Sequence, residues 1–168
     1  MTKKVLVLGA SGYVGSNLVP ALIKAGFEVR AASRNRRVLA AREWKGVELV
    51  QVDALVASSL PAAMDGVDVA FYLVHSMSSG KGFDQRDITA ANNFAQAAEQ
   101  AGVNRIIYLG GIIPPDSHSP HLTSRAATGD ALRAGSVPVV ELRAGIIVGP
   151  GSAAFEVMRD LVNHLPVM

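Results

Sequence analysis

Short apolar runs alternate with longer amphipathic segments along the whole chain. The first run, Lys4–Leu8, is almost continuously apolar and ends in a glycine, which is typical of a strand buried on both faces of a sheet. Five further runs predict strands in the same way: Phe27–Ser33, Val47–Val52, Val67–Val74, Arg105–Leu109 and Val137–Leu142.

Helical spacing fills the intervals between these runs. Val14, Leu18, Leu22 and Ala25 recur at intervals of three or four residues, and Gly26 predicts the end of that helix. Strands that alternate with helices imply right-handed crossovers and a parallel sheet. We therefore expect a doubly wound α/β fold of the Rossmann type, with strand order 3-2-1-4-5-6. Further helices are predicted from Ser58–Pro61, which is typical of a cap followed by an early proline, over Asp84–Ala101, over about 122–134 and from Ser152 onward.

Length and composition favour one globular domain over residues 1–168. Apolar residues make up 49% of the chain and charged residues 18%, and the mean hydropathy is +0.28, which is enough for a sizeable core. No run approaches the roughly 20 apolar residues of a membrane helix, and no signal-peptide pattern opens the chain. The absence of cysteine excludes disulfides and thiolate chemistry. We expect a cytoplasmic protein with no membrane partner.

The positive charge is local. Arg30, Arg34, Arg36 and Arg37 fall within eight positions, and the other 12 basic residues face 14 acidic ones. Such a cluster suits a small anionic group better than an extended phosphate backbone. Aromatic residues make up only 5% of the chain and do not interleave with the cluster, so we expect no nucleic-acid partner.

The strongest motif is the glycine-rich segment Gly9–Gly15 (GASGYVG), which joins the first strand to the first helix. Such a turn lets backbone approach a pyrophosphate and points helix N–H groups at it. Gly9 suits the tight turn, Gly12 the close approach and Gly15 the packing of helix on strand. The alternative is a glycine-rich turn without a ligand, and the spacing G-x-x-G-x-x-G differs from the common G-x-G-x-x-G. The residues expected to bind a dinucleotide here are Gly9, Ser11, Gly12, Tyr13, Val14 and Gly15.

The residues after the second strand indicate NADP rather than NAD. NAD sites place a carboxylate here for the ribose 2′-OH, whereas NADP sites place arginine for the 2′-phosphate. Ser33–Arg37 (SRNRR) contains arginines and no carboxylate. We expect Ser33 and Arg34 to bind the cofactor, with Arg37 as the second guanidinium and Arg36 facing solvent. The alternative is a solvated helix face.

Two further strand ends belong to the predicted site. Asp53, followed by Ala54, either accepts a hydrogen bond from the adenine amino group or caps a turn. Val74, His75 and Ser76 end the fourth strand, where the crevice of a doubly wound sheet lies, and we expect their backbone to line the nicotinamide ribose.

These motifs together resemble the extended and atypical short-chain dehydrogenases/reductases, and in particular the NAD(P)H-binding, NmrA-like branch. The resemblance rests on five segments: Gly9–Gly15, Val52-Asp53, Phe71–Met77 (FYLVHSM), Tyr108–Gly111 (YLGG) and Leu142–Gly151 (LRAGIIVGPG). Members of this family usually continue well past the length of this chain. The resemblance therefore implies a C-terminally truncated version without the family's substrate-binding region.

The same resemblance shows that this chain lacks the family's catalytic residues. The family uses a Tyr-x-x-x-Lys pair after the fifth strand and a serine at that strand's end. Here His121 stands at the tyrosine position, Arg125 at the lysine position and Gly110–Gly111 at the serine position. His121 is a candidate general acid and Arg125 a candidate holder of a ribose hydroxyl. The favoured alternative is that both belong only to a loop and a helix start. His118 and His121 have no third ligand nearby, so no metal site is expected.

Two functional classes follow. One is an NADPH-dependent oxidoreductase that transfers hydride to a quinone-like or carbonyl acceptor, with water or His121 supplying the proton. The other is a non-catalytic NADP(H)-binding redox sensor or regulatory module. A sugar-nucleotide epimerase or dehydratase is a weaker third, because it depends on the missing tyrosine. The expected partners are an unidentified small-molecule substrate and, for the assembly, a second copy of the chain in a homo-oligomer.

Overall fold

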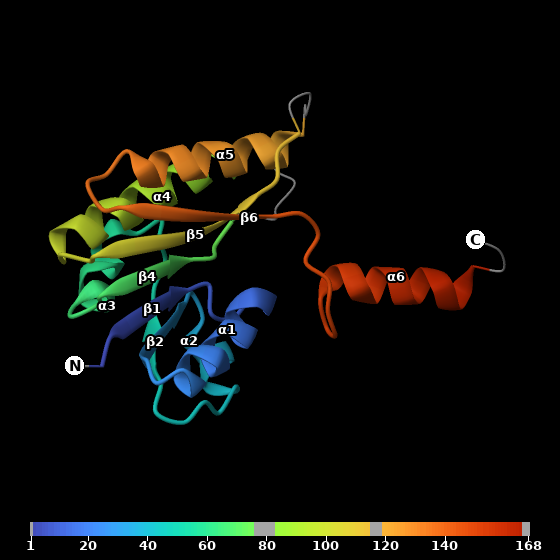
Figure 1. The fold of residues 1–168 in the computed structure, drawn as a ribbon, viewed down its shortest axis with the longest axis horizontal. Helices are drawn as coiled ribbons and strands as arrows, with labels where there is room; N and C mark the ends of the chain where they lie inside the picture. Colours follow the sequence, from blue (N-terminus) through green and yellow to red (C-terminus); the bar gives the residue numbers. More distant parts are fainter. Residues whose placement is uncertain (1, 76–82, 115–118, 166–168) are drawn as a thin grey trace.

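Six strands form one parallel sheet in the order β3-β2-β1-β4-β5-β6 (Figure 1), which confirms the predicted doubly wound topology. The computed structural model describes residues 2–75, 83–114 and 119–165. The strands are β1 (Lys4–Leu8), β2 (Glu28–Ser33), β3 (Glu48–Gln51), β4 (Val69–Tyr72), β5 (Arg105–Gly111) and β6 (Val139–Ala144).

The helices lie between the strands, as the pattern predicts, with one addition. The sequence pattern did not predict α2, a short helix that begins after Asn35, whose Oδ1 accepts a hydrogen bond from the Arg37 N–H at 3.0 Å. A side-chain oxygen at this position satisfies one of the free N–H groups of the first turn. The helices are α1 (Tyr13–Lys24), α2 (Arg36–Ala40), the single 3-10 turn η1 (Ala57–Ser59), α3 (Pro61–Met64), α4 (Phe83–Gln100), α5 (Pro120–Arg133) and α6 (Ala153–His164).

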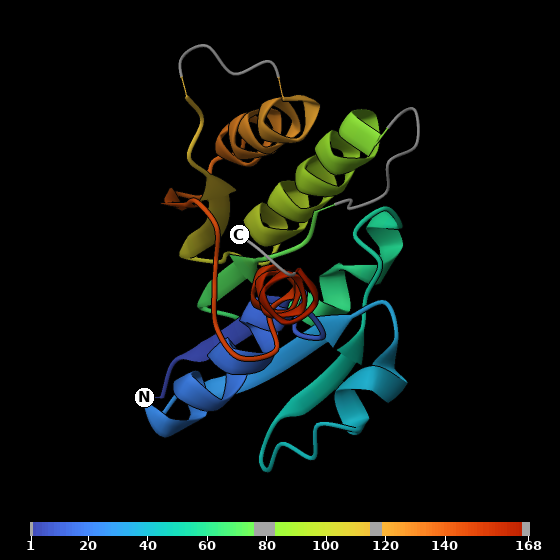
Figure 2. The same ribbon diagram turned by 90° about the vertical axis from the view of Figure 1, so that its right-hand side faces the viewer.

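The central strand β1 is buried on both faces. Leu6 and Leu8 pack into the larger core, which contains side chains of α3, α4 and α5, whereas Val5 and Val7 pack into a second core beneath α1 and α2. This alternation follows from the two-residue period of a strand. Figure 2 shows α4 and α5 side by side over one face of the sheet. The carboxyl ends of the strands therefore lie between the helices that cover the two faces of the sheet.

The four clustered arginines differ in burial, and Arg30 alone among them is buried. Arg30 lies buried in β2, where its Nε donates to Glu48 at 2.8 Å and its Nη1 donates to the carbonyl oxygens of Ala63 at 2.7 Å and Asp65 at 2.9 Å. The hydrogen bond from Arg30 is the main reason that the pKa of Glu48 lies below its ordinary value. Arg30 is thus a structural residue of the sheet, and its guanidinium is not directed to an anion.

The last helix stands away from the sheet (Figure 1). None of its residues is buried, although its large apolar side chains are numerous. Across the described ranges, no helix is both long and apolar enough to cross a bilayer. The exposed apolar side chains of α6 are Phe155, Val157, Met158, Leu161 and Val162.

Candidate functional site

A cavity of about 580 Å³ opens at the carboxyl ends of β1 to β4. This is the place where doubly wound sheets bind ligands, because the crossover direction reverses between β1 and β4 and leaves a crevice there. The lining consists of Leu8, Gly9, Ser11, Gly12, Ser33, Arg34, Val52, Asp53, Ala54, Leu55, Tyr72, Leu73, Val74, His75, Arg86, Asp87 and Ala90.

Most of the predicted cofactor residues meet in this lining. Tyr13, Val14, Gly15 and Arg37 lie outside the lining, and Ser76 lies outside the described residues. The four segments that follow β1, β2, β3 and β4 therefore converge, as expected for a dinucleotide site. The predicted residues that line the cavity are Gly9, Ser11, Gly12, Ser33, Arg34, Asp53, Ala54, Val74 and His75.

The glycine loop has the geometry that a diphosphate requires. Gly9 has a φ of +93°, a conformation that favours glycine, and a Cβ on Gly15 would lie 2.6 Å from the Cα of Ala10. Gly15 thus permits α1 to pack against the loop, as predicted. No side chain caps the start of α1 at Gly12. The first-turn N–H groups of α1 are therefore available to phosphate oxygens, and the loop fits a dinucleotide.

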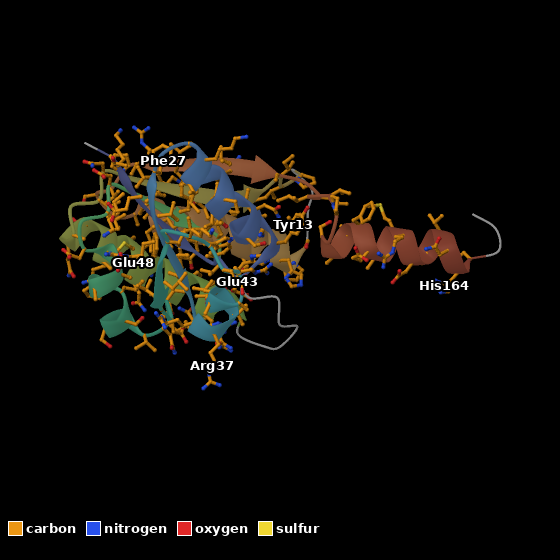
Figure 3. The ribbon with its side chains drawn as sticks, turned by 90° about the horizontal axis from the view of Figure 1, so that it is seen from below. Tyr13, Phe27, Arg37, Glu43, Glu48 and His164 are labelled. Atoms are coloured by element: carbon orange, nitrogen blue, oxygen red, sulfur yellow. The ribbon has the colours of Figure 1, made fainter. Side chains whose placement is uncertain are left out.

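Of the four clustered arginines, Arg34 is the one that lines the cavity. It is exposed, lines the cavity and forms no ion pair with any residue that the structure describes. Ser33 is buried and donates its hydroxyl to the Asn35 carbonyl oxygen at 2.9 Å, which holds the loop around Arg34. Arg37 points away from the domain (Figure 3). Arg36 donates its Nε to the Leu49 carbonyl oxygen at 3.1 Å rather than facing solvent alone.

Asp53 caps a turn. Its Oδ1 accepts a hydrogen bond from the Leu55 N–H at 3.0 Å, and Ser59 donates its hydroxyl to the Asp53 carbonyl oxygen at 2.8 Å. This arrangement fixes the wall of the cavity at the end of β3. Of the two alternatives for Asp53, the structure shows the turn, while the contact with adenine stays a prediction.

Titratable and charged groups of three elements lie near His75. His75 follows β4, Asp87 lies in the first turns of α4, and His121 and Arg125 lie at the start of α5. Loss of solvation at the cavity wall lowers the pKa of His75. The charges of Arg125 and His121 lower this pKa further, and that of Asp87 opposes them. Asp87 is buried, and Ser124 donates its hydroxyl to the Asp87 Oδ2 at 3.2 Å.

The two candidate catalytic residues lie one helical turn apart in α5 but differ in solvent exposure. His121 is exposed in the first turn of α5, and Arg125 is half-buried one turn later; neither lines the cavity. The buried Tyr108 donates its hydroxyl to the Arg125 carbonyl oxygen at 2.9 Å, and burial raises the pKa of Tyr108 to about 12. Tyr108 therefore holds α5 on the sheet and does not replace the family's tyrosine.

Side chains of α5 and β6 lie beside the glycines at the family's serine position. A Cβ on Gly110 would lie 3.1 Å from the Cδ of Glu141, and one on Gly111 would lie 3.3 Å from a methyl carbon of Leu122. A larger residue at either position would therefore require these side chains to shift.

Sequence reasoning missed the contribution of α4 to the cavity. Arg86, Asp87 and Ala90 line it, and so does Tyr72, whose pKa is raised by burial and by the charge of Asp87. The available signal was the order of elements, because a helix that follows β4 must begin at the carboxyl edge of the parallel sheet. Across the described ranges, no group of three or more histidines or carboxylates could hold a metal ion.

The profile of the NmrA-like family matches residues 1–141. The chain belongs to the NmrA-like family. A curated relative of this NmrA-like protein is a 3β-hydroxysteroid dehydrogenase/isomerase of Mycobacterium tuberculosis, 33% identical over 115 residues, which are 62% of this chain and 30% of the relative.

Two solved structures show the same fold over nearly the whole chain. Triphenylmethane reductase of Citrobacter sp., determined with NADP(H), has a TM-score of 0.78 and 24% identity and covers 95% of this chain and 55% of its own. The Bordetella bronchiseptica enzyme WbmG, determined with NAD, has a TM-score of 0.80 and 21% identity and covers 97% of this chain and 60% of its own. The NmrA-like protein thus has a Rossmann fold and spans less than two thirds of the length of each of these proteins.

Proposed function

We propose that this NmrA-like protein binds NADP(H) in the cavity and serves as an oxidoreductase toward a quinone-like or carbonyl acceptor. The observation that carries the proposal is that the α1 N-terminus and Arg34, neither of which has a side-chain partner among the described residues, converge on one cavity. The glycine loop would hold the diphosphate and Arg34 the 2′-phosphate. The names of the solved neighbours and of the steroid dehydrogenase, which concern nicotinamide cofactors and redox enzymes, agree with this assignment.

A bound reduced nicotinamide would supply the hydride. The residues of this chain would orient the two reactants and provide a route for the proton. His75 follows β4 and lines the half of the crevice that would receive the nicotinamide. Because His121 is exposed and lies outside the lining, we propose that water rather than His121 supplies the proton.

Binding and turnover test the two parts of this proposal separately. NADPH should raise the melting temperature, and the protein should oxidise NADPH in the presence of at least one member of a panel of quinones and aldehydes. A protein that binds NADPH but oxidises it with no acceptor would favour the sensor or regulatory module. Failure of both NADPH and NADH to raise the melting temperature would refute the binding site.

A further inference from the structure

Arg86 is a second unpaired guanidinium in the cavity. It lies in the first turn of α4, it is exposed, and it lines the cavity. Neither an ion pair nor a side-chain hydrogen bond joins it to another residue within the part of the chain that the structure describes. Its five N–H donors are thus open to a ligand.

The contacts of α4 show which way this part of the helix faces. Arg86, Ala90 and Asn93 follow one another at helical spacing and share one face. Ala90 lines the cavity, and Asn93 donates its Nδ2 to the Ala54 carbonyl oxygen at 2.9 Å, at the end of β3. The face that carries Arg86 therefore borders the cavity at Arg86 and Ala90 and contacts the segment after β3 at Asn93.

The charged side chains that line the cavity favour an anionic ligand. The two carboxylates of the cavity lining already accept hydrogen bonds from the protein: Asp53 from the Leu55 N–H and Asp87 from the Ser124 hydroxyl. The two exposed arginines of the lining, Arg34 and Arg86, have no such partner among the described residues. Two guanidinium groups in one cavity repel each other until an anion lies between or beside them. A ligand with more than one phosphate meets this requirement.

The position of Arg86 in the fold distinguishes its role from that of Arg34. Arg34 follows β2, on the side of β1 away from β4, whereas α4 follows β4, which is paired directly with β1. The glycine loop follows β1, and α1 packs on the opposite face of the sheet from α4. The glycine loop and Arg86 thus approach the same part of the crevice from opposite helical layers.

We propose that Arg86 binds the diphosphate of the dinucleotide from the side opposite the glycine loop. This inference rests on the proposed cofactor site. Because the diphosphate is common to NADP and NAD, Arg86 governs the affinity for both cofactors, while Arg34 governs the choice between them. Arg86 and the α1 N-terminus together form a two-sided clamp.

The test is titration calorimetry of Arg86→Gln with NADPH and with NADH. Both dissociation constants should rise at least about tenfold, the loss expected for a hydrogen bond to a charged group, and by similar factors. The melting temperature without ligand should not change, since Arg86 is exposed and unpaired. Arg105→Gln is the matched control, because Arg105 is exposed at the amino end of β5, at the opposite edge of the sheet. Arg86→Lys, which keeps the charge, should lose less.

Three results would overturn the inference, and they are distinguishable. Unchanged affinities in Arg86→Gln, with normal binding by the wild type, would show that Arg86 is a solvated helix residue. A loss confined to NADPH would assign Arg86 to the 2′-phosphate instead of the diphosphate. Binding of neither cofactor by the wild type would remove the proposed function and this inference with it.

Discussion

Ser124 and Asp87 join two helices beneath the cavity. The Ser124 hydroxyl of α5 donates to the Asp87 Oδ2 of α4 at 3.2 Å, and both side chains are buried. A buried carboxylate is stable only with hydrogen-bond donors around it. This bond therefore fixes the start of α4, which carries Arg86, against the start of α5, which carries Arg125.

Removing the Ser124 hydroxyl should destabilise the fold. We expect Ser124→Ala to lower the free energy of unfolding by about 1–3 kcal/mol, because it leaves a buried carboxylate with one donor fewer. Thr123→Ala is the control, since Thr123 immediately precedes Ser124 in the helix but is exposed. Urea unfolding followed by circular dichroism measures both variants. Equal stability of Ser124→Ala and the wild type would show that the hydrogen bond contributes nothing net.

Glu48 should make stability depend on acid pH. Its pKa is lowered in the folded state, principally by the hydrogen bond from Arg30, so its contribution is complete above the ordinary pKa of 4.5 and is lost as the pH falls through the lower, folded-state pKa. Glu48→Gln should therefore flatten the loss of unfolding free energy below pH 4.5. Because Glu48 is 47% exposed, the effect is expected to be modest. A variant whose acid profile matches that of the wild type would contradict this origin of the shift.

Arg34 should select NADPH over NADH. Arg34→Ala removes the unpaired guanidinium at the end of β2, and we expect it to weaken NADPH binding by about 1.5–3 kcal/mol while leaving NADH nearly unchanged. Arg37→Ala serves as the control, because Arg37 is exposed and lies outside the cavity lining. Equal losses for both cofactors would show that Arg34 does not bind the 2′-phosphate.

The spacing of residues that are close in the sequence was sufficient to predict most of the strands and helices and the glycine loop that lines the cavity. The run Lys4–Leu8 and the glycines that follow it carry their information in adjacent residues, so the strand, the turn and the start of α1 could be predicted together. The structural role of Arg30 could not be predicted in this way because its partners are distant in the sequence: Glu48 lies in the neighbouring strand, and the Ala63 carbonyl lies in α3. A charged residue within an apolar strand of a parallel sheet is itself a signal of a buried ion pair.

The contribution of α4 could not be read from local spacing. Arg86 and Asp87 are adjacent in a polar helical turn, and only the packing of α4 on the sheet shows that both line the cavity while one of them is buried. The pairing of Asp87 with Ser124 depends on how α4 and α5 pack against each other, which no periodicity of either helix specifies.

His121 should prove dispensable. Its exposed position outside the cavity lining predicts that His121→Phe leaves NADPH affinity and NADPH oxidation nearly unchanged. His164→Phe, on the exposed helix α6, is the matched control. Loss of a general acid typically costs about 10²–10⁴ in rate. A hundredfold fall in turnover with unchanged NADPH affinity would therefore identify His121 as the proton donor.

The central claim is that the cavity at the carboxyl ends of β1 to β4 binds NADP(H). Calorimetric titration of the unmodified chain with NADPH and, separately, with NADH tests it most directly. The account predicts one NADPH bound per chain, at least about tenfold more tightly than NADH, which is the worth of one charge-assisted hydrogen bond to the 2′-phosphate. Absence of saturable binding of either dinucleotide by the folded protein would contradict it.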